Sequence, residues 1–389
     1  MKKIFPHFWS YMLVFILFSC QTPDTDSIDL SRPAGTIIQK LSDMADNLCA
    51  IPLETNDSCL LSDYIKIWVG NKYIVTADKN AMHLFGKDGK HIRQLASQGK
   101  GPGEFSSIAT FTVNESNERL YYRDWNQRTS LGVIHLKTGE NTEKIQGIPN
   151  DISSLLLTDN HTLLCSTSSG IGKTAGKKYD LVIISENGQK LSHIVADTIN
   201  IDKAKNIFND YLSRIGDRIS YWSPNTDHIL FQIEDSLKMP LLVFQIKDPF
   251  NYKKRRGNFL RIKAETAEEL MIQMQEYEIF TEEEGMFGVR SIPNSKTFDY
   301  RINKNDRSVY LIDHFYDDLL GEKYPSFPQI TVTNGNHIFI QKNTQQIKQL
   351  TEEQLKAGKE LTPALKALNA RLNEDDNPVI ITGTLKKPI

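Results

Sequence analysis

The sequence of 389 residues is poor in the features that most directly indicate a chemical activity. It holds only four cysteines, with no CxxC pair and no cysteine beside histidine at the spacing of a zinc site. HExxH and GxSxG motifs are also missing, so neither a zinc peptidase nor a serine hydrolase is indicated. The sequence therefore predicts no catalytic residues, no metal site and no cofactor.

Excess charge of one sign is missing as well. Lysine and arginine total 46 against 48 aspartates and glutamates, a formal net charge of -2. A protein that binds nucleic acid usually carries a strong positive field, so we expect no nucleic-acid partner. Beyond residue 20 no apolar run approaches the 18 residues that span a bilayer, so a transmembrane helix is not expected in the mature chain.

The N-terminus is typical of an export signal. Lys2 and Lys3 form a short basic region, and residues 8–18 form an apolar stretch of the length found in signal peptides. The stretch ends in Ser19 and Cys20, which resembles a bacterial lipobox. We expect residues 1–19 to be removed and Cys20 to carry the lipid that anchors the protein in the outer membrane, facing either the periplasm or the cell surface. The alternative is an ordinary signal peptide with an incidental cysteine.

Residues 20–35 are polar, contain two prolines and show no apolar period, so we expect a flexible tether. The folded domain is then expected to cover residues 36–389. Its three cysteines, Cys49, Cys59 and Cys165, cannot all pair within one chain. Cys49 and Cys59 could form a disulfide in an oxidising compartment, but the favoured interpretation is three small buried side chains.

An internal repeat indicates the fold. Gly89, Gly139 and Gly188 lie 50 and 49 residues apart, each between two short apolar runs, in the pattern of a β-hairpin turn. A second type of strand recurs six times, at Tyr73–Ala77, Leu120–Arg123, Thr162–Cys165, His228–Gln232, Ser308–Ile312 and His337–Ile340. Repeated units of about four short antiparallel strands are typical of a β-propeller. We therefore predict an all-β, six-bladed β-propeller.

The later blades are expected to carry helical insertions. Thr266 and Glu269 are spaced as a capping box, which predicts a helix over residues 267–284. A second helix is expected from Thr351, and a third from Pro363 to about Asn373. A propeller must close its ring, so we expect strands at Leu48–Thr55 and at residues 377–385 to complete the sixth blade together.

Several of these segments resemble the six-bladed β-propeller lipoproteins that are abundant in Bacteroides and its relatives. The resemblance rests on the lipobox, Ile51–Thr55, Asp88–Lys90, Gln98–Phe105 and Asp376–Ile380, and it covers nearly the whole mature chain. The chain is also similar to NHL-type propellers, which mostly bind proteins or other ligands and only occasionally catalyse. The resemblance implies a fold and a location in the cell envelope more than a reaction.

Candidate binding residues follow from the predicted topology. In a four-stranded blade, the connections to the next blade share a face with the loops that join the second strand to the third. Aromatic and charged side chains would gather on this face, where they can hold a sugar or a peptide by stacking and hydrogen bonding. The candidates are Lys100, Glu104, Asp124, Trp125, Arg128, His314 and Tyr316.

The glycine-rich segment Gly99–Gly103 also admits a purely structural interpretation. A phosphate-binding loop of the Walker type needs Lys-Ser or Lys-Thr after its last glycine, whereas Glu104 follows in this chain. The segment is instead expected to turn the chain from the first blade into the second, with Glu104 accepting hydrogen bonds from nearby backbone amides.

The sequence thus predicts a monomeric, non-catalytic binding or scaffold propeller, anchored in the envelope, for a glycan, a peptide or an envelope protein. The alternative is a lyase or hydrolase that acts on polysaccharide or peptide. Its acidic and basic residues would come from different blades and would leave no linear motif.

Overall fold

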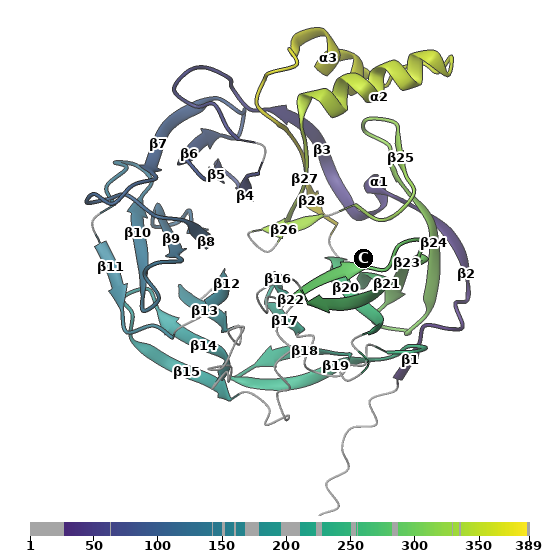
Figure 1. The fold of residues 1–389 in the computed structure, drawn as a ribbon, viewed down its shortest axis with the longest axis horizontal. Coiled ribbons are helices and arrows are strands. Elements are labelled where there is room, and N and C mark those ends of the chain that lie inside the picture. Colours follow the sequence, from purple (N-terminus) through teal and green to yellow (C-terminus); the bar gives the residue numbers. More distant parts are fainter. Residues whose placement is uncertain are drawn as a thin grey trace, which may run out of the picture.

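The computed structural model describes most of the chain after residue 26. The described ranges are 27–62, 64–141, 143–149, 152–158, 161–167, 179–195, 211–222, 228–249, 254, 256–281, 287–328, 330–333 and 336–386. The strands of the described ranges form six sheets, which we number 1 to 6 in the order in which they follow round the ring. The first strand of each sheet lies nearest the centre (Figure 1).

Three of the sheets are simple four-stranded meanders whose strands run in chain order from the ring centre outwards. Sheet 1 holds β4 (Lys66–Val69), β5 (Tyr73–Ala77), β6 (Ala81–Gly86) and β7 (His91–Ser97). Sheet 2 holds β8 (Ile108–Asn114), β9 (Arg119–Asp124), β10 (Ser130–His135) and β11 (Glu143–Gln146). Sheet 3 holds β12 (Ile152–Leu157), β13 (Thr162–Thr167), β14 (Tyr179–Ser185) and β15 (Lys190–Val195).

The other three sheets each receive an outermost strand from the N-terminal segment. Sheet 4 holds β16 (Tyr211–Ile215), β17 (Arg218–Trp222), β18 (Ile229–Glu234), β19 (Leu237–Gln245) and β1 (Ser27–Asp29). Sheet 5 holds β20 (Arg256–Glu265), β21 (Glu269–Thr281), β23 (Thr297–Asn303), β24 (Val309–Asp317) and β2 (Gly35–Lys40), with β22 (Phe287–Ser291) and β25 (Glu322–Tyr324) at its sides. Sheet 6 holds β26 (Thr331–Thr333), β27 (His337–Lys342), β28 (Val379–Leu385) and β3 (Ala45–Pro52).

Buried apolar clusters lie between neighbouring sheets all the way round the ring. The middle strands therefore bury both faces, as Leu163, Leu164 and Cys165 of β13 show. The innermost strands β16 and β26 also approach each other, although their sheets are not neighbours. This arrangement is an all-β β-propeller, so that part of the predicted fold is confirmed.

The predicted hairpin glycines occupy equivalent turns. Gly89, Gly139 and Gly188 join the third and fourth strands of sheets 1, 2 and 3, with φ angles of 83°, 76° and 91°. These angles lie in the left-handed region, which a residue with a Cβ adopts only at a cost. The spacing of about 50 residues therefore reflects one turn repeated in three consecutive sheets.

The register predicted for sheets 4 and 5 is wrong. His228–Gln232 falls on β18, a third strand, and Ser308–Ile312 falls on β24, a fourth strand. In sheet 4 the hairpin between the third and fourth strands turns at Asp235 and Ser236, which adopt positive φ without glycine. Sheet 4 therefore lacks the turn glycine that marks the repeat in sheets 1 to 3. Without it, a third strand was predicted as a second strand.

The ring is closed as predicted, by strands from both ends of the chain. β28 pairs antiparallel with β3, with Val379 opposite Pro52 and Ile381 opposite Ala50. The N-terminal segment does more than this, because β1 pairs parallel with β19 and β2 pairs parallel with β24. We call residues 27–52 the strap, because they run along the outside of three successive sheets (Figure 1).

The strap corrects the predicted domain boundary. Residues 27–35 were expected to belong to a tether, yet β1 lies in sheet 4, and Ile28 and Leu30 are only 3% and 1% exposed. Two apolar side chains in a polar stretch were too weak a pattern to predict a strand. The folded domain therefore includes residues 27–35, while the expected signal peptide and Cys20 lie outside the described residues.

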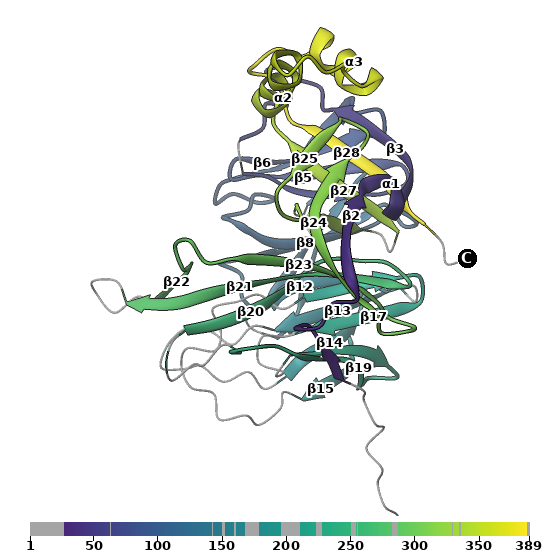
Figure 2. The same cartoon turned by 90° about the vertical axis from the view of Figure 1, so that its right-hand side faces the viewer.

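The helix expected over residues 267–284 is instead β21, which extends beyond the ring on one face (Figure 2). The Thr266 hydroxyl accepts a hydrogen bond from the Glu269 N–H at 2.9 Å, the bond that a helix N-cap would accept. In this chain it closes a β-turn instead, since the Thr266 N–H donates to the Glu269 carbonyl. The side chains of Leu270–Met274 are all buried, because β21 is covered on both faces.

Three helices occur among the described residues, and two of them lie between β27 and β28. α1 (Leu41–Met44) is a single turn between β2 and β3. α2 (Thr344–Lys356) begins at an Asn343 cap rather than at Thr351, whose hydroxyl donates to the Ile347 carbonyl inside the helix. α3 (Pro363–Arg371) begins as expected, with Thr362 as its N-cap. None of these helices is long and apolar enough to cross a membrane.

Candidate functional site

The glycine-rich segment forms a tight loop between sheets 1 and 2. The Glu104 carboxylate accepts a hydrogen bond from the Gly101 N–H at 2.6 Å, and the Gly99 N–H donates to the Phe105 carbonyl. Phe105 is fully buried, and the Asn141 side chain donates to the Gly103 carbonyl at 2.6 Å. The role expected for Glu104, that of bonding backbone amides, is confirmed.

Asp124 has a similar structural role. Its carboxylate is 2% exposed and accepts hydrogen bonds from the Ser106 N–H at 2.8 Å, the Asn126 N–H at 3.0 Å and the Ser106 hydroxyl. Burial raises the pKa of Asp124, but these hydrogen bonds outweigh it and hold the pKa below its ordinary value. Asp78 occupies the same position in sheet 1 and accepts from the Ser62 N–H at 2.8 Å. Each aspartate thus fastens the chain entering its sheet to the end of the second strand.

The remaining candidates on sheet 2 lie at the surface. Trp125 is 55% exposed, and Lys100 and Arg128 are also exposed. The Arg128 carbonyl accepts a hydrogen bond from the buried Arg123 guanidinium at 2.5 Å, so the backbone of this loop is held in place. Nothing in the arrangement assigns a ligand to Trp125, and its binding role stays a prediction.

His314 and Tyr316 were expected in a loop, but they lie on β24 beneath the strap. His314 is opposite Ile38 of β2 and Tyr316 is opposite Lys40. The His314 Nδ1 lies 2.6 Å from an Asp313 carboxylate oxygen. These two residues belong to the outer part of sheet 5, whereas Trp125 belongs to sheet 2 across the ring (Figure 1). The structure therefore does not bring the seven candidates together into one site.

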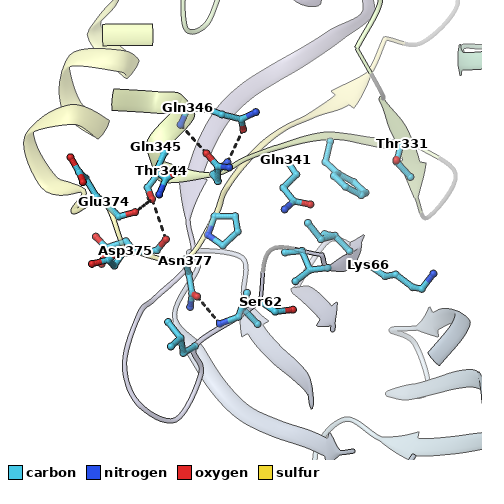
Figure 3. Close-up of a pocket in the computed structure, with 18 residues that line it drawn as sticks. Ser62, Lys66, Thr331, Gln341, Thr344, Gln345, Gln346, Glu374, Asp375 and Asn377 are labelled. Carbon is cyan, nitrogen blue, oxygen red and sulfur yellow. Dashed lines mark hydrogen bonds between the residues drawn. The ribbon is translucent and has the colours of Figure 1, made fainter. Parts of the chain in front are cut away.

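A cavity lies where the ring closes, between sheet 6 and sheet 1 (Figure 3). We call it the closure pocket; its volume is about 990 Å³. Three chain segments line it: residues 60–67, residues 331–346 around β27 and the start of α2, and residues 374–378 before β28. The closure pocket opens on the face of the ring on which the candidate binding residues were predicted, because the segments before β4 and between β27 and β28 are connections of that face. The pocket lies between sheets 6 and 1, however, and none of the predicted residues lines it.

One wall of the closure pocket is apolar. Leu60, Leu61, Ile65 and Ile67 come from the connection into sheet 1 and from β4, and Phe339 comes from β27. Leu60 is 61% exposed, whereas Phe339 is only 7% exposed. Exposed apolar side chains beside a concave surface are typical of a ligand-binding site.

Asn377 holds the two sides of the pocket together. Its side-chain oxygen accepts from the Leu61 N–H at 2.9 Å, and its side-chain nitrogen donates to the Glu54 and Cys59 carbonyls at 2.6 and 2.8 Å. Nearer the ring centre, the Thr333 hydroxyl donates to the Val69 carbonyl at 2.6 Å and so connects β26 to β4. These bonds make the pocket a preformed feature of the closed ring.

The third side is formed by the first turn of α2 and the acidic segment Glu374–Asp376. The Thr344 hydroxyl donates to the Glu374 carbonyl at 2.6 Å, which holds that segment against the helix N-terminus. Carboxylates are stabilised there by the helix dipole. The Asp376 carboxylate accepts from the Asn373 N–H, while the carboxylates of Glu374 and Asp375 are exposed.

Polar side chains complete the lining. Gln341 lies at the pocket centre and Gln345 lies on the first turn of α2 (Figure 3). Neither side chain hydrogen-bonds to another residue within the part of the chain that the structure describes. Lys66 lines the side nearest the ring centre, because β4 is the innermost strand of sheet 1. The pocket thus offers amide donors and acceptors, one cation and two free carboxylates beside an apolar wall.

The lining gives no indication of a cofactor or a metal. Over the described ranges, no three His, Cys, Asp or Glu side chains are grouped so that they could hold a metal ion. The lining contains no cysteine or histidine. The arrangement supports binding by shape, hydrogen bonds and charge.

The closure pocket was missed by sequence reasoning because its residues share no motif. The first of its three segments is separated from the other two by more than 260 residues of sequence and meets them only through ring closure. The one available signal was the predicted pairing of both chain ends in a single blade, since that pairing also brings residues 374–378 beside residues 54–61.

The cysteines differ from the favoured interpretation. Cys59 and Cys165 are buried, but Cys49 is exposed on β3, and none of the three forms a disulfide. Cys49 lies on the outermost strand of sheet 6, where alternate side chains point to solvent.

Several solved structures are similar to this chain. A crystal structure of a protein from Bacteroides fragilis NCTC 9343, provisionally described as exported, is similar with a TM-score of 0.63 and 16% identity, covering 90% of this chain and 100% of that one. A DUF4221 family member from Bacteroides vulgatus has a TM-score of 0.48 at 12% identity, covering 88% and 98%. The WD40 β-propeller domain of Doa1 has a TM-score of 0.41 at 10% identity, covering 87% and 97%.

No curated protein matches this chain. The sequence itself does match a family over almost the whole folded part, residues 27–384. That range begins at β1 and ends within β28, so it coincides with the closed ring and its strap. The chain therefore belongs to the family described as domain of unknown function DUF4934.

Proposed function

We propose that this protein is a binding propeller of the cell envelope that holds its ligand in the closure pocket and does not catalyse a reaction. The ligand classes that fit are those expected from the sequence: a peptide, a glycan or a segment of an envelope protein. The single observation that carries the proposal is the cavity of about 990 Å³ with an apolar wall and two glutamines whose amides are available to a ligand.

We propose further that each of the six sheets is one blade, and that lipid on Cys20 anchors the ring in the outer membrane. The exported description of the Bacteroides fragilis protein and the signal-like N-terminus support this location. Because the strap begins at Ser27, only residues 21–26 separate the proposed anchor from it. Six residues span at most about 20 Å. The lipid would then hold the ring close to the membrane surface.

A thermal-shift screen tests the binding proposal. Residues 20–389 carrying Cys20→Ser, so that no lipid is attached, are screened against oligosaccharides, peptidoglycan fragments and short peptides. A ligand at about 100 times its Kd stabilises the folded state by about 2.7 kcal/mol. We expect at least one compound to raise the melting temperature.

Substitutions in the closure pocket and at Trp125 then locate the binding site. Gln341→Ala combined with Gln345→Ala should abolish the shift, whereas Trp125→Ala should leave it unchanged. A shift that is lost in Trp125→Ala and kept in the glutamine variant would move the site to sheet 2 and overturn the proposal. Conversion of the bound compound into products would replace binding with catalysis.

A further inference from the structure

We infer that the closure pocket is built for a short peptide with two free ends, bound with its amino group at Glu374 and Asp375 and its carboxylate at Lys66. The inference rests on the proposed function and names the chemical class of its ligand. It starts from the distribution of charge along the pocket, which is opposite at the two ends (Figure 3).

The acidic end is formed by Glu374 and Asp375. Both carboxylates are exposed, and neither has a hydrogen-bond or ion-pair partner among the described residues. The backbone of their segment is fixed by the hydrogen bond from Thr344, so the carboxylates are presented from a rigid loop. Exposed carboxylates in a fixed position can receive an ammonium group with charge-assisted hydrogen bonds.

The basic end is Lys66, at the start of β4. It is the one cation in the lining, and no carboxylate of the described chain lies within ion-pair distance of it. An unpaired ammonium group beside a cavity favours a carboxylate on the ligand. A ligand that spans both ends must therefore carry a positive charge at one end and a negative charge at the other.

The middle of the pocket matches peptide chemistry. Gln341 lies between the two charged ends, and its amide both donates and accepts, as peptide groups do (Figure 3). The apolar wall of Leu60, Leu61, Ile65 and Ile67 suits aliphatic side chains.

A neutral glycan fits this lining less well. A sugar is held by hydrogen bonds to its hydroxyls together with stacking of its ring on an exposed aromatic side chain. Phe339 is the aromatic residue of the lining, and its 7% exposure leaves little ring surface available. The observations therefore favour the peptide.

Equilibrium dialysis with mass spectrometry tests the inference. The probes are three libraries of tripeptides built from Ala, Val, Leu and Phe: one with free termini, one N-acetylated and one C-amidated. The protein is residues 20–389 with Cys20→Ser. We expect the free library to be retained, and each modification to weaken retention about tenfold or more, as removing one charged partner does.

Charge variants assign each end of the peptide. Glu374→Gln combined with Asp375→Asn should remove the discrimination against N-acetylation, and Lys66→Gln should remove the discrimination against amidation. Glu360→Gln and Lys137→Gln, both exposed and outside the pocket, are the matched controls and should change nothing.

The outcomes separate this inference from the proposed function. If no tripeptide is retained, or if free and modified peptides are retained equally, the inference is wrong. If an oligosaccharide panel then binds and Gln341→Ala weakens it, the proposed function still stands. If Gln341→Ala affects no ligand that binds, both are wrong.

Discussion

At the scale of single residues, buried carboxylates hold the connections between sheets. Asp78 directly follows β5 and Asp124 ends β9, the second strands of their sheets. Each carboxylate accepts a hydrogen bond from a backbone N–H of the segment that enters the same sheet. Both have pKa values below the ordinary range, because hydrogen bonds to the charged form outweigh the effect of burial. In a propeller each connection between sheets crosses from an outer strand to an inner one. These hydrogen bonds hold the connection against the sheet that it enters.

Asp124→Asn should therefore destabilise the fold. The amide keeps one acceptor oxygen but loses the charge, so the free energy of unfolding should fall by about 1–3 kcal/mol. Because the folded pKa of Asp124 is depressed, its stabilisation is present above the unfolded pKa and is lost as the pH falls through the folded value. Urea denaturation at pH 7 and pH 3 should show the deficit shrinking at the lower pH. Asp57→Asn, at an exposed position, is the control; an equal loss in both variants would contradict this role.

Asp317 shows the opposite behaviour. It is fully buried at the end of β24, where its carboxylate accepts from the Leu319 and Leu320 N–H groups at 3.0 and 3.1 Å. Burial raises its pKa to about 6, with Glu322 adding to the effect. Stability from this group is thus fully present below the unfolded pKa of about 3.9 and is lost as the pH rises through about 6.

Asp317→Asn isolates this effect. The unfolding free energy of the wild type minus that of the variant should decrease by on the order of 2–3 kcal/mol between pH 3.5 and pH 7. Chemical denaturation across that range measures the difference. A difference that does not change with pH would show that Asp317 titrates normally.

The cysteines give a simple test of burial. Cys49 is exposed, and Cys59 and Cys165 are buried, so thiol labelling of residues 20–389 with Cys20→Ser should modify one thiol in the native state and three after denaturation. Cys49→Ser should reduce the native count to zero. Fast labelling of Cys59 or Cys165 in the native protein would contradict the packing between sheets 6 and 1 or between sheets 2 and 3.

At the scale of elements, the strap distinguishes this ring from one closed by a single strand. β1, β2 and β3 add to the outer edges of sheets 4, 5 and 6, and so cover edges that would otherwise be open to pairing with other chains. Ile28 and Leu30 contribute to the core between sheets 4 and 5.

Removing residues 27–35 should be costly. Burial of an aliphatic side chain contributes about 1.5–3 kcal/mol, so losing Ile28 and Leu30 should lower stability by about 3–6 kcal/mol. We expect residues 36–389 to melt well below residues 27–389. Ile28→Ala combined with Leu30→Ala should account for most of the lost stability. Arg32→Ala should leave the melting temperature unchanged, because the Arg32 side chain is 87% exposed. Equal melting temperatures of the two chains would show that the strap is dispensable.

Elements were predictable where one local pattern decides the structure. The hairpins at Gly89, Gly139 and Gly188 and the pairing of β28 with β3 follow from turn chemistry and from strand-like ends. β21 was not predictable in this way, because Thr266 and Glu269 make the same hydrogen bond in a β-turn as in a capping box. Only the tertiary contacts that bury both faces of β21 select the strand.

At the scale of the whole molecule, the candidate site is a consequence of ring closure. The β-propeller fold was predictable from the repeat, but the closure pocket was not. Its lining combines residues 60–67 with residues 374–378, and the Asn377 side chain joins the two segments by three hydrogen bonds, to Leu61, Glu54 and Cys59. The pairing of the two chain ends in one sheet therefore also forms the cavity in which we propose that the ligand binds.

The most direct test of this account is hydrogen exchange on residues 20–389 with Cys20→Ser, alone and with the compound that gives the largest thermal shift. Binding in the closure pocket should slow exchange at residues 60–67 and 374–378, with no change at residues 98–107 and 124–128. Slower exchange at residues 124–128 without any change at the closure pocket would contradict it and would place the ligand beside Trp125.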